Sequence, residues 1–125
     1  MIIKKIKLEN IRSYLDQELD FSEGSTLLAG DIGSGKSSIL LAIDFALFGL
    51  RKGNLSGASL LRNGTNNGLV ELHFSLDNKE IIIQRNLKKL QESIVQDSGF
   101  IITNGIRRDA SAIELKQDII DLLNY

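Results

Sequence analysis

A glycine-rich stretch constrains the fold of this chain more than any other feature of its sequence. The run Gly30–Ser37, GDIGSGKS, matches the pattern G-x-x-x-x-G-K-[S/T] without a mismatch. A short apolar run, Thr26–Ala29, precedes it, and a run with helical spacing of apolar residues, Lys36–Phe48, follows it. A buried strand that leads through such a turn into a helix aims backbone N–H groups and the helix N-terminus at one place. The motif therefore predicts an α/β fold with a phosphate-binding loop.

The residue types of this loop suit a nucleotide with Mg²⁺. Lys36 is expected to reach the β- and γ-phosphates and act in catalysis, and the Ser37 hydroxyl to bind the metal. The remaining phosphate oxygens would accept hydrogen bonds from the backbone of Gly33, Ser34, Gly35 and Ser38. Chance produces the pattern in under about 1% of chains of this length, given average composition. We therefore predict nucleotide binding, and a glycine-rich turn without a ligand is the alternative.

Composition excludes several other classes of protein. The chain has 125 residues and no cysteine, so it has no disulfide framework, and its one histidine, His73, cannot build a zinc site alone. Fifteen basic against sixteen acidic residues leave a net charge of −1, so any DNA contact must come from a local patch. No apolar run approaches the roughly 18 residues of a membrane span. These features predict a soluble, intracellular protein.

Hydrophobic periodicity predicts a second group of strands and a last helix. Alternating residues indicate paired strands at 3–9 and 15–21 and a hairpin at 70–76 and 80–85, after an irregular connection over residues 51–68. Weaker strands are expected at Ser93–Gln96 and Phe100–Thr103, separated by a turn at Asp97–Gly99. Ser111 and Glu114 have the spacing of a capping box. The helix that they begin would present an apolar face of Ile113, Leu115, Ile119, Ile120, Leu122 and Leu123.

The sequence holds only half of a hydrolytic site. Hydrolysis needs a second carboxylate, usually at the end of a buried strand, and no predicted strand is an apolar run that ends in Asp or Glu. Asp77 ends an alternating strand and Asp121 lies within the last helix, so neither fits this role well. A small self-sufficient P-loop kinase or phosphotransferase would need them and stays an alternative. A non-enzymatic adaptor with a vestigial loop is a further one.

The chain resembles the N-terminal segment of the SMC-related, SbcC-type DNA double-strand-break-repair ATPases. The resemblance extends over roughly the whole chain and is strongest up to residue 50. It is carried by Ile6–Tyr14, Phe21, Gly30–Ser38, Ile39–Gly49, Leu60–Gly64, Val70–Phe74 and Ile81–Arg85.

This resemblance implies a split ATPase head of the ABC type. Residues 1–125 would form a single N-terminal lobe, in which a mixed sheet with an antiparallel β-subdomain surrounds the P-loop helix. The acidic strand and the signature motif would lie in a C-terminal lobe beyond a long coiled coil. The full-length protein would then be an ATPase that uses ATP and Mg²⁺, and this part alone would be inactive.

The resemblance also implies further site residues and partners. Arg12 and Ser13 would approach the phosphates, and Leu61, Arg62 and Asn63 would border the base and ribose. Within the loop, Gly30, Asp31 and Ile32 would also contact the nucleotide, and Ile32 stands where the family often has Asn. Expected partners are the C-terminal lobe, a second head across sandwiched ATP, an associated nuclease and DNA. The location would be cytoplasmic, near the nucleoid in a prokaryote, without a membrane.

Three groups of basic residues have two interpretations. They could face DNA, because phosphate contacts need clustered cations, or they could be solvated faces that protect sheet edges. We favour the second interpretation, and likewise expect His73 to face solvent rather than act in catalysis. The groups are Lys4, Lys5 and Lys7, then Lys88 and Lys89, and finally Arg107 and Arg108.

Overall fold

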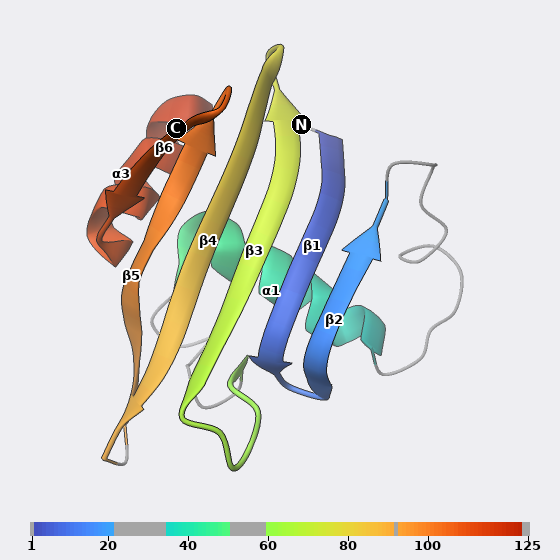
Figure 1. The fold of residues 1–125 in the computed structure, drawn as a ribbon, viewed down its shortest axis with the longest axis vertical. Helices are drawn as coiled ribbons and strands as arrows, with labels where there is room; N and C mark the ends of the chain where they lie inside the picture. Colours follow the sequence, from blue (N-terminus) through green and yellow to red (C-terminus); the bar gives the residue numbers. More distant parts are fainter. Residues whose placement is uncertain (1, 22–34, 51–59, 92, 124–125) are drawn as a thin grey trace.

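The computed structural model describes residues 2–21, 35–50, 60–91 and 93–123. They form a layer of β-sheet with two helices against it (Figure 1). The predicted strand Thr26–Ala29 lies outside the described residues. Their elements, in chain order, are β1 (Ile2–Ile11), β2 (Tyr14–Asp20), α1 (Gly35–Phe48), β3 (Asn67–Leu76), β4 (Lys79–Leu90), β5 (Ser93–Thr103), β6 (Ile106–Ala110) and α3 (Ala112–Leu123).

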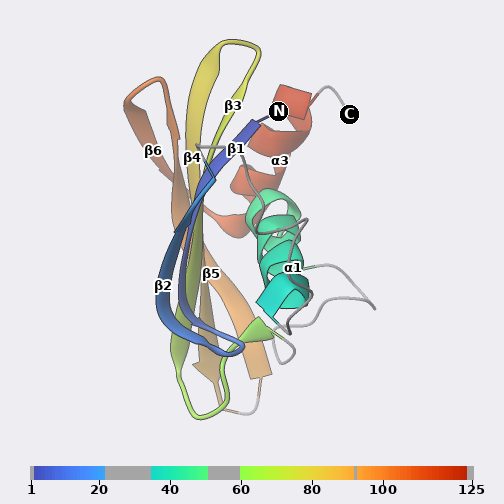
Figure 2. The same ribbon diagram turned by 90° about the vertical axis from the view of Figure 1, so that its right-hand side faces the viewer.

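The sheet has six strands in the order β2-β1-β3-β4-β5-β6, and each neighbouring pair is antiparallel. Figure 2 shows both helices on the same face of this sheet. Helix α1 packs across β1, β3 and β4, and α3 packs on β5 and β6 and against α1. The predicted pairing of the first two strands and the hairpin of β3 and β4 are confirmed.

The hydrophobic core lies between the sheet and the two helices. Successive side chains of a strand point to opposite faces, so every second residue of the central strands is buried. The buried residues of α1 pack against these strand side chains. Gly49, with a φ of 76°, ends this helix. The core side chains from the sheet include Ile6, Leu8, Val70, Leu72, Phe74, Ile81, Ile83 and Leu87.

The predicted turn at Asp97–Gly99 was wrong, because β5 is one continuous strand over Ser93–Thr103. Its pairing with β4 shifts register between Gln84 and Asn86, so the extra residue forms a bulge instead of a turn. The side-chain Nδ2 of Asn86 donates a hydrogen bond of 2.7 Å to the carbonyl of Ser98 in this bulge. A bulge thus accommodates the polar residues that the sequence pattern assigned to a turn.

Strand β6 is an element that the sequence pattern did not predict. Asn104 and Gly105, at φ angles of 48° and 86°, form a tight turn, and Ile106–Ala110 then pairs with β5. Its sequence, IRRDA, lacks the alternation that marks a half-buried strand. Charged residues are nevertheless typical of an edge strand, where they oppose pairing with another chain.

The capping box of the last helix is confirmed. The Ser111 N–H donates to Glu114 Oε1 at 2.9 Å, and the Glu114 N–H donates to Ser111 Oγ at 3.2 Å. Leu115 and Ile119 are buried as expected, but Ile113 is 82% exposed, so its place on the apolar face was wrong. Within the described residues, neither helix is long and apolar enough to cross a membrane.

Candidate nucleotide-binding site

The first turn of α1 is where the described structure meets the glycine-rich loop. Helix α1 begins at Gly35, so the backbone of Lys36 and Ser37 is helical, as the motif predicts. Gly30–Ser34 lie outside the described residues, as do the side chains of Lys36 and Ser37. Ser38, the next residue, is 3% exposed. Because the first N–H groups of a helix have no partner within it, this end of α1 can bind an anion.

The turn between β1 and β2 and the segment before β3 form one unit. The Arg12 N–H donates to the Leu60 carbonyl, and the Arg62 N–H donates to the Asn10 carbonyl, each at 2.9 Å. Ile11 forms an isolated antiparallel bridge with Leu61 between these two bonds. Segments about fifty positions apart in sequence are therefore held side by side by backbone hydrogen bonds, and each contributes residues to the predicted site.

Arg62 is attached to the β1–β2 turn through its side chain as well. Its Nη1 donates a 3.2 Å hydrogen bond to the carbonyl of Arg12. Arg12 has a φ of 50°, a backbone conformation that few residues other than glycine adopt. Such outliers persist only where the surroundings hold them, and they cluster at functional sites. The structure thus brings together Arg12, Ser13, Leu61, Arg62 and Asn63.

Gly68 permits the close approach of these two segments. A Cβ atom at this position would lie 2.7 Å from Leu61 Cδ1 and 3.0 Å from the carbonyl oxygen of Asn10. Asn10 Nδ2 also donates to the carbonyl of Asn67, at 2.9 Å. The start of β3 therefore packs directly on the end of β1. The space that a side chain at position 68 would need is taken by Leu61 and by the backbone of Asn10.

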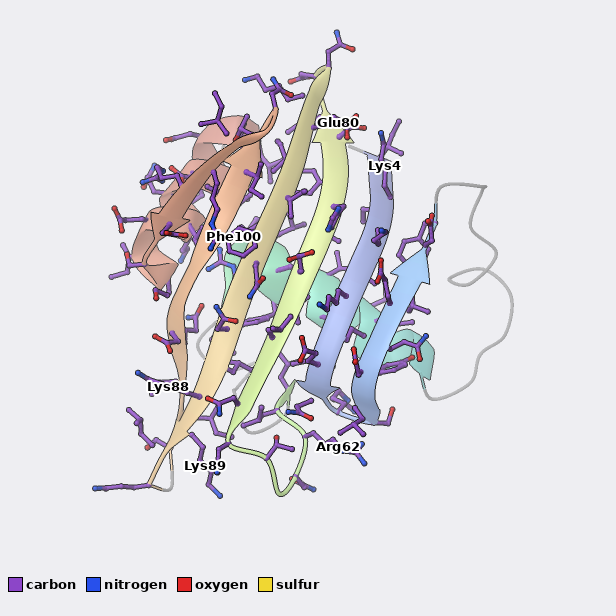
Figure 3. All side chains as sticks on the ribbon, viewed as in Figure 1. Lys4, Arg62, Glu80, Lys88, Lys89 and Phe100 are labelled. Carbon is purple, nitrogen blue, oxygen red and sulfur yellow. The ribbon has the colours of Figure 1, made fainter. Side chains whose placement is uncertain are left out.

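Both ribbon views place the beginning of α1 near the β1–β2 turn (Figures 1 and 2). Figure 3 shows Arg62 at this end of the sheet. The Arg62 side chain and the N-terminus of α1 lie at the same end of the molecule, and both favour an anion, since the first contributes positive charge and the second the positive end of the helix dipole.

Asp77 and Asp121 do not lie at this end of the molecule. Both line a cavity of about 680 Å³, together with Arg108 and Asp118, which form an ion pair with each other. The cavity lies between α3 and the turns that join β3 to β4 and β5 to β6, whereas α1 begins beside β2.

Within the described residues, no group of three or more His, Asp or Glu side chains could hold a metal ion. Oxygen donors such as the Ser37 hydroxyl suit Mg²⁺, which usually keeps several waters and takes phosphate oxygens as ligands.

The basic groups are largely paired with carboxylates. Exposed ion pairs add little stability. They nevertheless compensate the positive charge that would otherwise contact DNA phosphates. His73, on the uncovered face of the sheet, likewise lies 2.8 Å from Glu71. Figure 3 shows Lys4 beside Glu80 at one end of the sheet. The pairs are Lys4–Glu80 (2.8 Å), Lys5–Glu18 (2.8 Å), Lys7–Glu9 (3.8 Å), Lys88–Asp97 (3.7 Å), Arg107–Asp109 (3.0 Å) and Arg108–Glu114 (3.7 Å).

Sequence reasoning missed one buried charged residue, Arg85 of β4, which is 1% exposed. The signal was available in the alternation of β4. Arg85 has the same parity as Ile81 and Ile83, so a strand with those residues in the core must also direct Arg85 inward. A charged residue at an inward position calls for buried partners, and these lie on α1.

Comparison with known sequences gives one consistent group of relatives. Residues 5–124 match the AAA domain family. The chain is 37% identical over 123 residues to the "DNA double-strand break repair Rad50 ATPase" of Methanococcus maripaludis, and 34% identical over 125 residues to the protein of that name from Thermoplasma acidophilum. These alignments cover 98% and 100% of this chain but only 12% and 13% of the relatives' lengths. The chain thus spans a small part of the proteins that it matches.

A solved structure shares the fold. The recombination mediator protein RecF in its ATP complex superposes with a TM-score of 0.65 at 26% sequence identity. The likeness covers 91% of this chain and 29% of the RecF chain. The predicted fold, an α/β P-loop lobe with an antiparallel β-subdomain, is confirmed by this likeness and by the observed sheet.

Proposed function

Because this chain belongs to the AAA domain family and corresponds to the N-terminal ATPase lobe of Rad50 and SbcC-type proteins, we propose that it binds ATP with Mg²⁺ at the start of α1. One observation carries the proposal. The motif Gly30–Ser37 runs into a helix that begins at Gly35, and both ribbon views place the beginning of that helix near the β1–β2 turn. This turn contains Arg12, and the Arg62 side chain donates a hydrogen bond to the Arg12 carbonyl. Lys36 and Ser37 are then the ligands of the phosphates and of the metal ion.

In the full-length protein, this lobe would supply half of an ATPase site. Bound Mg²⁺ would neutralise charge on the phosphates, while Lys36 and the first N–H groups of α1 hold their oxygens. Arg12 and Ser13 would add contacts to the phosphates. Leu61, Arg62 and Asn63 would border the base and ribose. The carboxylate that orients the attacking water would come from the C-terminal lobe.

The partners follow from the same assignment. We propose that two such heads sandwich ATP, and that their engagement changes access of DNA and of an associated nuclease in double-strand break repair. The names of the Rad50 relatives support the repair process. The ion-paired basic groups on the sheet argue against a DNA surface made by this lobe alone.

Titration with ATP and Mg²⁺ tests the central claim. Lys36→Ala is expected to weaken ATP affinity by about 10- to 100-fold, because hydrogen bonds to charged groups contribute about 1.5–3 kcal/mol. Lys116→Ala is the matched control, since Lys116 is an exposed lysine of α3 and its loss should leave the affinity unchanged. Equal affinity in wild type and Lys36→Ala would instead support an adaptor with a vestigial loop.

The self-sufficient phosphotransferase makes a different prediction. It needs Asp77 or Asp121 for the metal, although both line the cavity beside α3. Asp77→Asn and Asp121→Asn should therefore leave Mg²⁺-dependent ATP binding unchanged. A loss of Mg²⁺-dependent turnover in either variant would favour the phosphotransferase.

A further inference from the structure

Arg85 of β4 donates hydrogen bonds to main-chain carbonyl oxygens, two of them in the last turn of α1. Its Nε donates to the Ala46 carbonyl at 2.8 Å, and its Nη2 donates to the Leu47 carbonyl at 3.1 Å. Its Nη1 donates to the carbonyl of Ala112, the first residue of α3, at 3.4 Å. One guanidinium from β4 therefore ties the end of α1 to the sheet and to the beginning of α3.

The charge of Arg85 is stabilised only while the end of α1 stays in contact with the guanidinium group. The last carbonyls of a helix lack partners within it and carry the negative end of the helix dipole, so a cation placed there is stabilised. Burial lowers the pKa of Arg85 to about 10, which still leaves the group charged at neutral pH. A buried charge that loses its acceptors is costly. Moving α1 away from Arg85 is therefore strongly opposed.

The end of α1 is shaped around this side chain. Gly49 follows the helix, and its N–H donates to the Phe45 carbonyl at 2.8 Å. A Cβ atom on Gly49 would lie 3.2 Å from Arg85 Nη1 and 2.6 Å from Gln96 Oε1. The helix end thus fits closely over Arg85 because residue 49 has no side chain.

Hydrophobic packing alone specifies the placement of α1 poorly. The helix is apolar nearly all round, and Leu40, on its far side, is 50% exposed. Turning such a helix about its axis replaces one apolar side chain by another, so burial changes little. Hydrogen bonds are directional and fail steeply with angle. The bonds from Arg85 to Ala46 and Leu47 are therefore well suited to fix both the rotation and the axial position of α1.

We propose that Arg85 is a positioning residue of the nucleotide site. By holding the last turn of α1, it sets where the first turn, with Lys36 and Ser37, stands relative to the β1–β2 turn. A helix of 14 residues is stiff enough to carry a displacement from one end to the other. This inference rests on the proposed function, because it assumes that the first turn of α1 binds nucleotide.

The test compares Arg85→Met and Arg85→Lys with a control of similar stability loss. Ile101→Ala is that control, because it removes a buried side chain from β5 and leaves the bonds of Arg85 in place. Urea unfolding first defines conditions in which each variant is fully folded. Under these conditions, Arg85→Met should weaken affinity for ATP with Mg²⁺ by about tenfold, the effect of removing outer partners of binding groups at metal sites. Arg85→Lys should recover part of this loss, and Ile101→Ala should bind as the wild type does.

Several outcomes would overturn the inference. Unchanged ATP affinity in folded Arg85→Met would do so, as would an equal loss of affinity in Ile101→Ala, which would indicate a general effect of stability. If Arg85→Met does not fold, the ATP affinity of Arg85→Lys decides. An ATP affinity equal to that of the wild type would overturn the inference, because one ammonium group cannot bond to all these carbonyls.

Hydrogen exchange separates this inference from the proposed function. The amides of Ile39–Ile43, in the first half of α1, should exchange faster in Arg85→Met than in Ile101→Ala. A folded wild type that does not bind ATP would overturn the proposed function, while the exchange of these amides would still decide whether Arg85 positions the helix. Equal exchange in the two variants would count against Arg85.

Discussion

At the scale of single residues, Gly99 sets the contact between the two strands beside the bulge. A Cβ atom here would lie 2.0 Å from the carbonyl oxygen of Gln84 and 3.0 Å from its carbonyl carbon. Both atoms are backbone of the neighbouring strand, so no side-chain movement relieves the clash. We expect Gly99→Ala to lower the free energy of unfolding by about 1–3 kcal/mol, as overpacking of a core does. Urea unfolding of the variant measures this.

The matched control for Gly99 is Gly105. Gly105 has a φ of 86° in the turn before β6, and a Cβ atom there would have no neighbour within 4 Å among the described residues. Asn tolerates this left-handed conformation, so Gly105→Asn should change the stability only slightly. Equal stability of Gly99→Ala and wild type would contradict the close approach to Gln84.

At the scale of elements, the start of α3 links stability to pH. The Ser111 N–H that donates to the Glu114 carboxylate, with Arg108 nearby, holds the pKa of Glu114 below its ordinary value. A lowered carboxyl pKa stabilises the folded chain at neutral pH. This contribution is complete above the ordinary value of about 4.5, and it disappears as the pH falls through the lower, folded value. Glu114→Gln keeps an acceptor but no charge, so its deficit in unfolding free energy should be larger at pH 7 than at strongly acidic pH.

The control for this pH effect is another charged residue on the same helix. Lys116 is exposed and does not belong to the capping box, so Lys116→Gln should not change the acid limb of the stability curve. The measurement is urea unfolding at several pH values. A stability difference between wild type and Glu114→Gln that stays constant with pH would contradict the charged capping bond.

The elements that the sequence predicted well are those whose signals are local. Helix α1, the capping box of α3 and the hairpin of β3 and β4 each follow from spacing within the element itself. The sequence pattern predicts two strands in place of β5, because Asp97–Gly99 has the composition of a turn. The bulge becomes apparent only from the pairing with β4, whose register shifts between Gln84 and Asn86. Strand β6 was missed because an edge strand has little apolar alternation.

At the scale of the whole molecule, the resemblance to a family predicted that the segments around Arg12 and Arg62 lie together, but not how they are held. The proximity of Arg12 and Arg62 was expected from the resemblance to a family, because no local pattern relates residues so far apart in sequence. The hydrogen bond that joins them forms only when β1 and β3 are neighbours in the sheet. Arg85 could have been predicted to point inward, but its carbonyl partners depend on where α1 crosses the sheet.

The arrangement of charges over the whole chain predicts how ATP hydrolysis should behave. Helix α1 begins near the β1–β2 turn, while Asp77 and Asp121 line the cavity beside α3, so neither carboxylate is placed to orient water at the beginning of α1. This chain alone should therefore release phosphate from ATP more slowly than about 1 per second, the lower end of ordinary turnover. Addition of the C-terminal lobe of the same protein should raise the rate, and Lys36→Ala should abolish that increase. Ordinary turnover by this chain alone would show that the catalytic carboxylate lies within these 125 residues, because a split site cannot complete the reaction from one lobe.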